Sequence, residues 1–116
     1  VLSITACAVQ VKHHYPPDIE NIPNNELVKL NIKPAIGSNR AYAAITMIDF
    51  DIVEITAANN PLYLKPGYHY LRIRFRGPYI STAPIDLDFN GEAGEEYSVV
   101  TITTGYSFSA DIKREH

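Results

Sequence analysis

The chain has 116 residues, of which 46% are hydrophobic and 20% charged, and its ten basic and thirteen acidic side chains give a formal charge of −3. This length predicts one compact domain, and the composition excludes an intrinsically disordered chain. The acidic balance argues against a dedicated nucleic-acid-binding protein, because phosphate contacts need an excess of basic side chains. No apolar run reaches the roughly 20 residues that a transmembrane helix requires.

The N-terminal residues divide into two segments of different composition. Residues 1–11, VLSITACAVQV, are apolar and include Cys7, the only cysteine, so an intrachain disulfide and the multi-cysteine zinc motifs are excluded. One interpretation of this block is an N-terminal strand in which Cys7 is a small buried residue. Residues 12–25 contain three prolines and three asparagines, which predict a linker. The domain itself is expected over residues 26–114.

The first part of that domain shows short strands with alternating polarity. Val28, Leu30 and Ile32 share one parity and polar residues the other, which indicates a half-buried strand that ends at Pro34. Residues 41–56 predict two strands with a bend around residues 49–51. A helix is the alternative there, but the many β-branched residues favour strands.

The second part begins at Pro66-Gly67, which fits a type II turn because glycine supplies the positive φ at its third position. A strand follows over residues 68–76. Further strands are predicted over 85–90, 95–104 and 106–112, making about seven. Such a series favours an all-β fold, a single antiparallel β-sandwich that is immunoglobulin-like or transthyretin-like.

The turn chemistry carries a resemblance to a known family. The run from Leu64 through Lys65-Pro66-Gly67-Tyr68 to Ile73, together with the run Ala93 to Tyr97, resembles the PEGA-type domains and related small β-sandwiches of the cell envelope. The resemblance covers residues 27–112 and implies a binding or structural module rather than an enzyme.

A second resemblance concerns the N-terminus. Leu2-Ser3-Ile4-Thr5-Ala6-Cys7 resembles the lipobox of a bacterial lipoprotein signal peptide, with Ile4, Thr5, Ala6 and Cys7 matching position by position. The resemblance implies that residues 1–6 are a signal-peptide remnant and that Cys7 carries the lipid. It places the protein in the bacterial cell envelope, in the periplasm at the inner or outer membrane, attached to the membrane by this anchor only.

Residue patterns for catalysis and for metal binding are weak. The chain has four histidines and no nucleophile-elbow pattern, and His69 shares the parity of Leu71 and Ile73, so it is interpreted as a core or rim residue. Asp49, Asp51 and Glu54 are interpreted as solvated bend carboxylates rather than a cation site, because no glycine pivot accompanies them. We therefore expect no enzymatic activity, no bound metal and no cofactor.

The outward parity of the strand over residues 68–76 is the candidate binding surface, consisting of Tyr68, Tyr70, Arg72, Arg74 and Arg76. Tyrosine and arginine are enriched where protein surfaces meet. If Arg72 and Arg74 lie beside Asp86 and Asp88 of a neighbouring strand, however, the charges neutralise each other, and only Tyr68, Tyr70 and Arg76 stay free.

Two functional hypotheses follow. The first is a non-enzymatic envelope lipoprotein module that binds an envelope protein or a surface component, as a possible subunit of a larger assembly. The alternative is a carbohydrate-binding sandwich whose exposed tyrosines stack on sugar rings.

Overall fold

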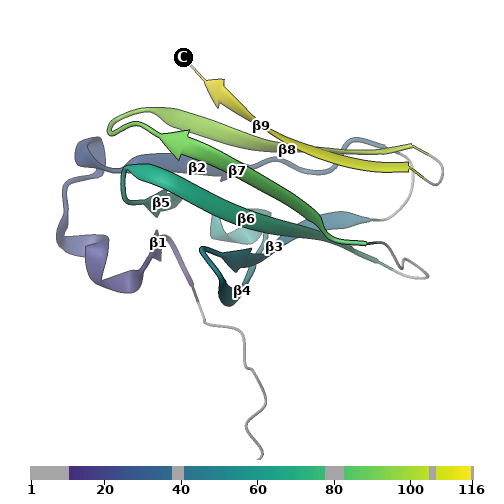
Figure 1. The fold of residues 1–116 in the computed structure, drawn as a ribbon, viewed down its shortest axis with the longest axis horizontal. Coiled ribbons are helices and arrows are strands. Elements are labelled where there is room, and N and C mark those ends of the chain that lie inside the picture. The colour runs from purple at the N-terminus through teal and green to yellow at the C-terminus, as the bar shows by residue number, and fades with distance from the viewer. Residues whose placement is uncertain (1–10, 38–40, 78–82, 105–106, 116) are drawn as a thin grey trace, which may run out of the picture.

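The fold is a β-sandwich of two sheets, seen in a computed structural model that describes residues 11–37, 41–77, 83–104 and 107–115 (Figure 1). The five-stranded sheet has the order β1 (His14–Tyr15), β5 (Leu62–Leu64), β2 (Val28–Ile32), β8 (Glu96–Thr104) and β9 (Ser107–Glu115). The four-stranded sheet has the order β4 (Asp51–Ile55), β3 (Tyr42–Ile48), β6 (Gly67–Arg76) and β7 (Ile85–Gly91).

The all-β sandwich class is confirmed, with nine strands in the described ranges where about seven were predicted. Within the described ranges the remaining regular structure is three short 3-10 helices: η1 (Pro17–Asn21), η2 (Asn24–Glu26) and η3 (Ala57–Asn59). None of the described helices is long and apolar enough to span a membrane. The two strands predicted within residues 41–56 are present as β3 and β4, which excludes the helical alternative.

The sandwich is not purely antiparallel. β2 pairs antiparallel with β5 but parallel with β8, where Lys29 lies opposite Glu96 and Ile32 opposite Val99. The short β1 also runs parallel to β5. Parallel pairs need a long crossover connection, and here the chain between β2 and β8 forms the whole of the second sheet.

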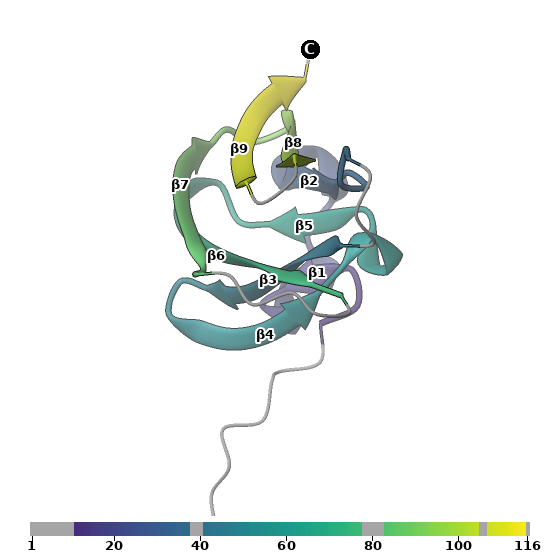
Figure 2. The same cartoon turned by 90° about the vertical axis from the view of Figure 1, so that its right-hand side faces the viewer.

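The core lies between the sheets and is built from the predicted inward parities. In β6 these are His69, Leu71, Ile73 and Phe75, all buried. Val28, Leu30 and Ile32 of β2 face them, whereas Ile85, Leu87 and Phe89 of β7 and Phe108, Ala110 and Ile112 of β9 are only partly buried. Figure 2 shows β7 and β9 along one side of the sandwich, where they are not hydrogen-bonded to each other in the described chain.

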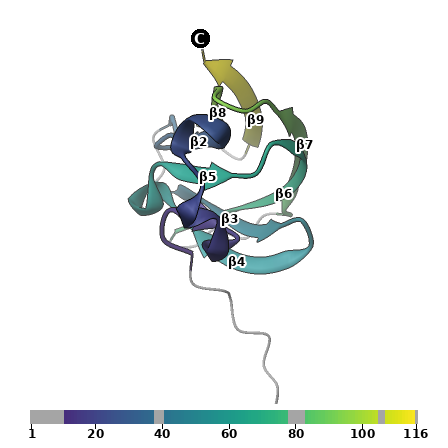
Figure 3. The same cartoon turned by 90° about the vertical axis from the view of Figure 1, so that its left-hand side faces the viewer.

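The segment predicted to be a linker differs from that prediction, because part of it packs on the domain. Tyr15 and Ile19 are buried, and the Tyr15 hydroxyl donates to the carboxylate of Asp51. The backbone N–H of Tyr63 donates to the carbonyl of His13 over 2.8 Å. Residues 11–25 therefore fold against the edge of the five-stranded sheet, below β5 in Figure 3.

The β3–β4 hairpin has two local irregularities that shape the outer surface. A β-bulge shifts the register between Ile45 and Met47. The hairpin then closes through a two-residue loop in which Asp49 has φ 49° and Phe50 has φ 71°. Positive φ at both central residues is what a type I′ turn requires, although Asn and Gly are its usual residues.

Candidate binding surface

All five residues of the predicted surface lie on the outer face of the four-stranded sheet. They alternate along β6 with the buried residues, so their side chains share the face that is turned away from the core. β3 and β7 flank β6 and contribute the neighbouring side chains, because Met47 lies opposite Arg72 on one side and Asp86 opposite Arg72 on the other. We refer to this surface as the outer face.

Carboxylates on β7 neutralise part of the outer face. Nε of Arg72 donates to Asp86 over 2.9 Å, which lowers the pKa of the Asp86 carboxyl and raises that of the Arg72 guanidinium. The Tyr68 hydroxyl donates to Asp88 over 2.6 Å, and this hydrogen bond raises the pKa of Tyr68. The predicted pairing of Arg72 with an aspartate of β7 is thus confirmed.

The other two arginines exchange the roles that the sequence predicted. Arg76 was expected to stay free, but its guanidinium donates to Glu54 of β4 over 2.8 Å. Arg74 was expected to lie opposite or diagonal to Asp86 and Asp88, and it does lie diagonal to Asp86, which is opposite Arg72. No ionic partner for Arg74 is present among the described residues, however, and its partner on β3 is Ala44. β7 pairs with β6 only as far as Ile73, so neither aspartate is directly opposite Arg74.

An aromatic pair stands at one end of the outer face. The Phe50 ring stacks on the Tyr70 ring, with 4.8 Å between centroids and 19° between planes. Phe50 is 77% exposed, more than any other large hydrophobic residue of the described chain, so one side of its ring stays open to solvent. Tyr68, on the same strand face as Tyr70, is 64% exposed.

A polar clamp holds this aromatic pair in position. The two oxygens of Asp49 contact Nδ1 of His69 at 2.7 Å and the backbone N–H of Tyr70 at 2.9 Å. Nε2 of His69 lies 2.7 Å from the carbonyl oxygen of Lys65, so both ring nitrogens have partners. The core or rim role predicted for His69 is confirmed, and Asp49 ties the hairpin loop to β6.

Apolar side chains gather on the outer face more than elsewhere. Of six large hydrophobic residues that are exposed in the described ranges, four belong to this face: Tyr42, Phe50, Ile52 and Tyr68. Ile52 lies opposite Met47, and Tyr42 lies opposite Arg76. The sequence analysis missed Phe50 and Ile52, because the bulge in β3 and the two-residue loop change the parity that it followed.

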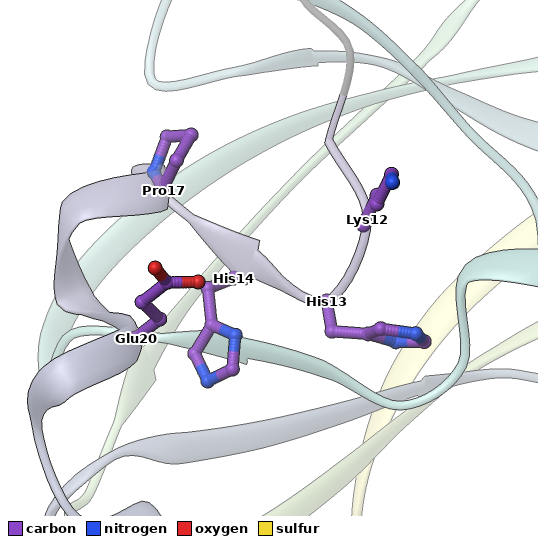
Figure 4. A pocket seen from close by; sticks show the side chains of 5 residues that line it. All are labelled: Lys12, His13, His14, Pro17 and Glu20. Atoms are coloured by element: carbon purple, nitrogen blue, oxygen red, sulfur yellow. The ribbon is translucent and has the colours of Figure 1, made fainter.

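A cleft lies beside the N-terminal segment. Lys12, His13, His14, Pro17 and Glu20 line a cleft of about 400 Å³ (Figure 4). His14 stacks on Tyr63, and Nδ1 of His13 lies 3.3 Å from the carbonyl oxygen of Pro61. In Figure 4 the imidazole of His14 turns away from that of His13, so the side chains do not converge on one point.

The three bend carboxylates are not gathered into a site. Asp49 contacts His69, Asp51 accepts from Tyr15, and Glu54 pairs with Arg76. In the part of the chain that the structure describes, no group of three or more His, Cys, Asp or Glu residues is placed to hold a metal ion. Cys7 lies outside the described residues, so its proposed lipidation stays a prediction.

Comparison with known proteins identifies no relative of this chain. No protein-family model matches the chain, and no curated protein and no solved structure matches it. The surface described above is therefore interpreted from its own chemistry.

Proposed function

We propose that the protein is a non-enzymatic binding module of the bacterial cell envelope, held at the periplasmic face of a membrane by a lipid on Cys7. Its outer face binds another envelope protein or a surface component, as one subunit of a larger assembly. The observation that carries this proposal is the concentration of exposed aromatic and aliphatic side chains on the outer face, among them Phe50, Ile52 and Tyr68. Aromatic residues and arginine are enriched at protein interfaces.

The chemistry of the outer face defines the partner that fits it. Its ion pairs satisfy Arg72 and Arg76 internally, so the face offers little net charge. Phe50 supplies an apolar projection, and Arg74 supplies a cation without an ionic partner in the described chain. The partner surface would therefore present an apolar pocket for the Phe50 ring and a carboxylate for Arg74, four residues farther along β6 than Tyr70.

The finer fold type is part of the proposal. In immunoglobulin-like sandwiches the consecutive strands A and B lie side by side in one sheet, of order A-B-E-D. Here the consecutive strands β2 and β3 belong to different sheets, and β2 pairs with β5 and β8. This connectivity supports a transthyretin-like sandwich over an immunoglobulin-like one, and the PEGA-like resemblance concerns the turn before β6.

A photo-crosslinking experiment tests the binding face. A photoreactive amino acid at position 68 should capture one specific protein in intact cells, and the adduct should be lost when Phe50→Ala or Arg74→Glu is added. A crosslinker at Lys29, a half-exposed residue of β2 in the other sheet, is the matched control. An adduct at position 68 that persists in both variants would contradict the proposal, as would the same adduct from position 29.

A fractionation experiment tests the anchor separately. When the full gene is expressed in a bacterium, intact mass should show a diacylglycerol on Cys7, and Cys7→Ser should move the protein from the membrane to the soluble fraction. A Cys7→Ser protein that stays with the membrane would refute the lipoprotein assignment.

Carbohydrate binding is the second candidate, and the open side of the Phe50–Tyr70 stack favours it, since sugar rings stack on exposed aromatic faces. A glycan array with Tyr68→Ala and Tyr70→Ala controls decides this point. Binding that both changes weaken would support it, and absent or indifferent binding would remove it.

A further inference from the structure

β9 is a long, regular edge strand whose protection consists of charged side chains, Asp111, Lys113, Arg114 and Glu115. Its nine residues pair with β8 in an unbroken register, without a bulge and without proline. No described strand pairs with its other edge. By contrast, the opposite edge strand of the same sheet, β1, has only two residues and is followed by Pro16 and Pro17. A long, regular edge is a template for pairing with another strand, and the charges on it restrict which strand can pair.

The direction of the unpaired groups in β9 follows from one hydrogen bond. The Ile112 N–H donates to the side chain of Asp111 over 2.8 Å, so it is not used by β8 and points to the free edge. Because N–H and C=O groups alternate between the two sides of a strand, the even-numbered residues of β9 present their backbone to this edge. The central part of β9 therefore presents the backbone N–H and C=O groups of Ala110 and Ile112 at the free edge.

The side chains of β9 are complementary to a second copy of themselves in one register. Antiparallel pairing about a two-fold axis at Ile112 places Asp111 opposite Lys113 of the second copy, and by symmetry this happens twice. It also places Ser109 opposite Glu115 and Ile112 opposite itself. Opposite charges on directly paired residues stabilise a sheet, whereas like charges destabilise it.

Neighbouring registers are less complementary. An axis at Asp111 places the two copies of that carboxylate opposite each other, and an axis at Lys113 does the same with two ammonium groups. An axis at Arg114 pairs Lys113 with Glu115, but it opposes two guanidinium groups and leaves Asp111 and the first half of β9 outside the pairing. An axis at Ala110 leaves Lys113 opposite Ser107. The charges of β9 therefore select Ile112 as the axis.

We propose that two copies of the chain pair through β9, antiparallel about Ile112, and join their five-stranded sheets into one continuous sheet. The Asp111 carboxylate, which caps the Ile112 amide in the single chain, then turns to Lys113 of the second copy, and the amide donates to the backbone of the second copy. Figures 1 and 3 show the C-terminal end of β9 projecting from the body of the sandwich, where a second strand can approach.

The pairing is independent of the proposed function. The outer face belongs to the other sheet, so both copies keep it free, and the dimer presents two binding faces. A bivalent module gains avidity for a partner that is itself repeated on a surface.

A charge-exchange series measured by sedimentation velocity tests the pairing. The 116-residue chain, under reducing conditions, should be a dimer at micromolar to submillimolar concentration. Asp111→Lys and Lys113→Asp should each weaken the dimer by at least about tenfold, because each places like charges opposite one another. The double variant Asp111→Lys/Lys113→Asp restores both pairs and should restore the dimer. Circular dichroism and thermal unfolding check that the variants fold.

Hydrogen exchange locates the interface in the same samples. The amides of Ala110 and Ile112 should exchange more slowly as the wild-type concentration rises, and those of Phe50 and Asp51 should not change. A monomeric wild type overturns the proposal, and so does a dimer that both single variants leave intact or that the double variant fails to restore.

Discussion

Phe50 occupies a backbone conformation that its own side chain disfavours. Its φ of 71° lies in the left-handed region, where a Cβ atom costs about 1–2 kcal/mol. Its ring is also largely exposed, so burial in the single chain offsets little of this cost. Strained residues of this kind persist where the surrounding structure holds them, and they concentrate at functional sites. Phe50 is therefore the residue on which the proposed interface depends most.

Glycine at position 50 should separate stability from binding. Phe50→Gly relieves the positive φ and loses only an exposed stacking contact, so the free energy of unfolding should rise by about 1 kcal/mol. Phe50→Ala keeps the strained Cβ and should not be stabilised. Urea unfolding measures both, and both variants should lose the crosslink from position 68. A destabilised glycine variant would show that the ring contributes to folding instead.

Tyr15 has a residue-scale consequence at high pH. Burial, followed by the hydrogen bond to Asp51, raises the pKa of its hydroxyl above the ordinary value of about 10. The neutral hydroxyl is thus favoured in the folded state, and its contribution is present below about pH 10 and lost as the pH rises above it. Lowering the pH does not change the protonation of this hydroxyl, which is already neutral at pH 7.

Tyr15→Phe should test that sign. At pH 7 the variant should be less stable by about 1 kcal/mol, since a partly buried hydrogen bond is lost. Above about pH 10 the gap to the wild type should narrow, because only the wild type must keep this phenol protonated in order to keep the bond. Urea unfolding at the two pH values measures the gap, and a gap that stays constant would contradict the assignment.

At the scale of elements, Asp49 fastens the β3–β4 hairpin to β6. Asp49→Ala removes the acceptor of the Tyr70 N–H and the partner of His69 Nδ1, so it should cost about 2 kcal/mol of unfolding free energy. Asp88→Ala, which removes an exposed carboxylate from β7, is the matched control and should change stability much less. Urea unfolding measures the cost, and hydrogen exchange should show the Tyr70 amide exchanging faster in Asp49→Ala only. Equal losses in the two variants would show that the clamp has no special role.

The elements that could be predicted were those with a regular period. β2, β6 and β7 alternate without interruption, so the side of every residue followed from its parity. In β3, by contrast, Ala43, Ala44 and Ile45 are buried in succession near a bulge, which no alternation encodes. Proline and asparagine in residues 12–25 correctly argue against long elements, but the burial of Tyr15 and Ile19 depends on distant partners.

The candidate site was predictable only in part, for the same reason. Its arginines and tyrosines on β6 followed from parity, and so did the pairing of Arg72 with β7. The exchange of roles between Arg74 and Arg76 could not be foreseen, because it depends on where β7 stops pairing and on Glu54 of β4. Phe50 belongs to the site because the loop between β3 and β4 has only two residues, and the sequence did not define where these two strands end.

At the scale of the whole molecule, Gly91 allows β7 of one sheet to approach β2 of the other. A Cβ atom at this position would lie 2.7 Å from a methyl group of Val28. Gly91→Ala should therefore cost roughly 1–3 kcal/mol through overpacking. Val28→Ala removes the opposing methyl groups, so the double variant should be more stable than the sum of the single effects predicts. Thermal and urea unfolding measure this coupling, and strictly additive losses would contradict the close approach.

The parallel pairing of β2 with β8 also governs when the protein can fold. In a chain that emerges N-terminus first, from a ribosome or a translocation channel, β2 can pair with β5 well before Glu96 is released to pair with Lys29. The five-stranded sheet therefore closes only after the last part of the domain has been released, and contacts between such distant segments form slowly. Until then one edge of β2 is unpaired, and an unpaired strand edge exposes a folding chain to aggregation.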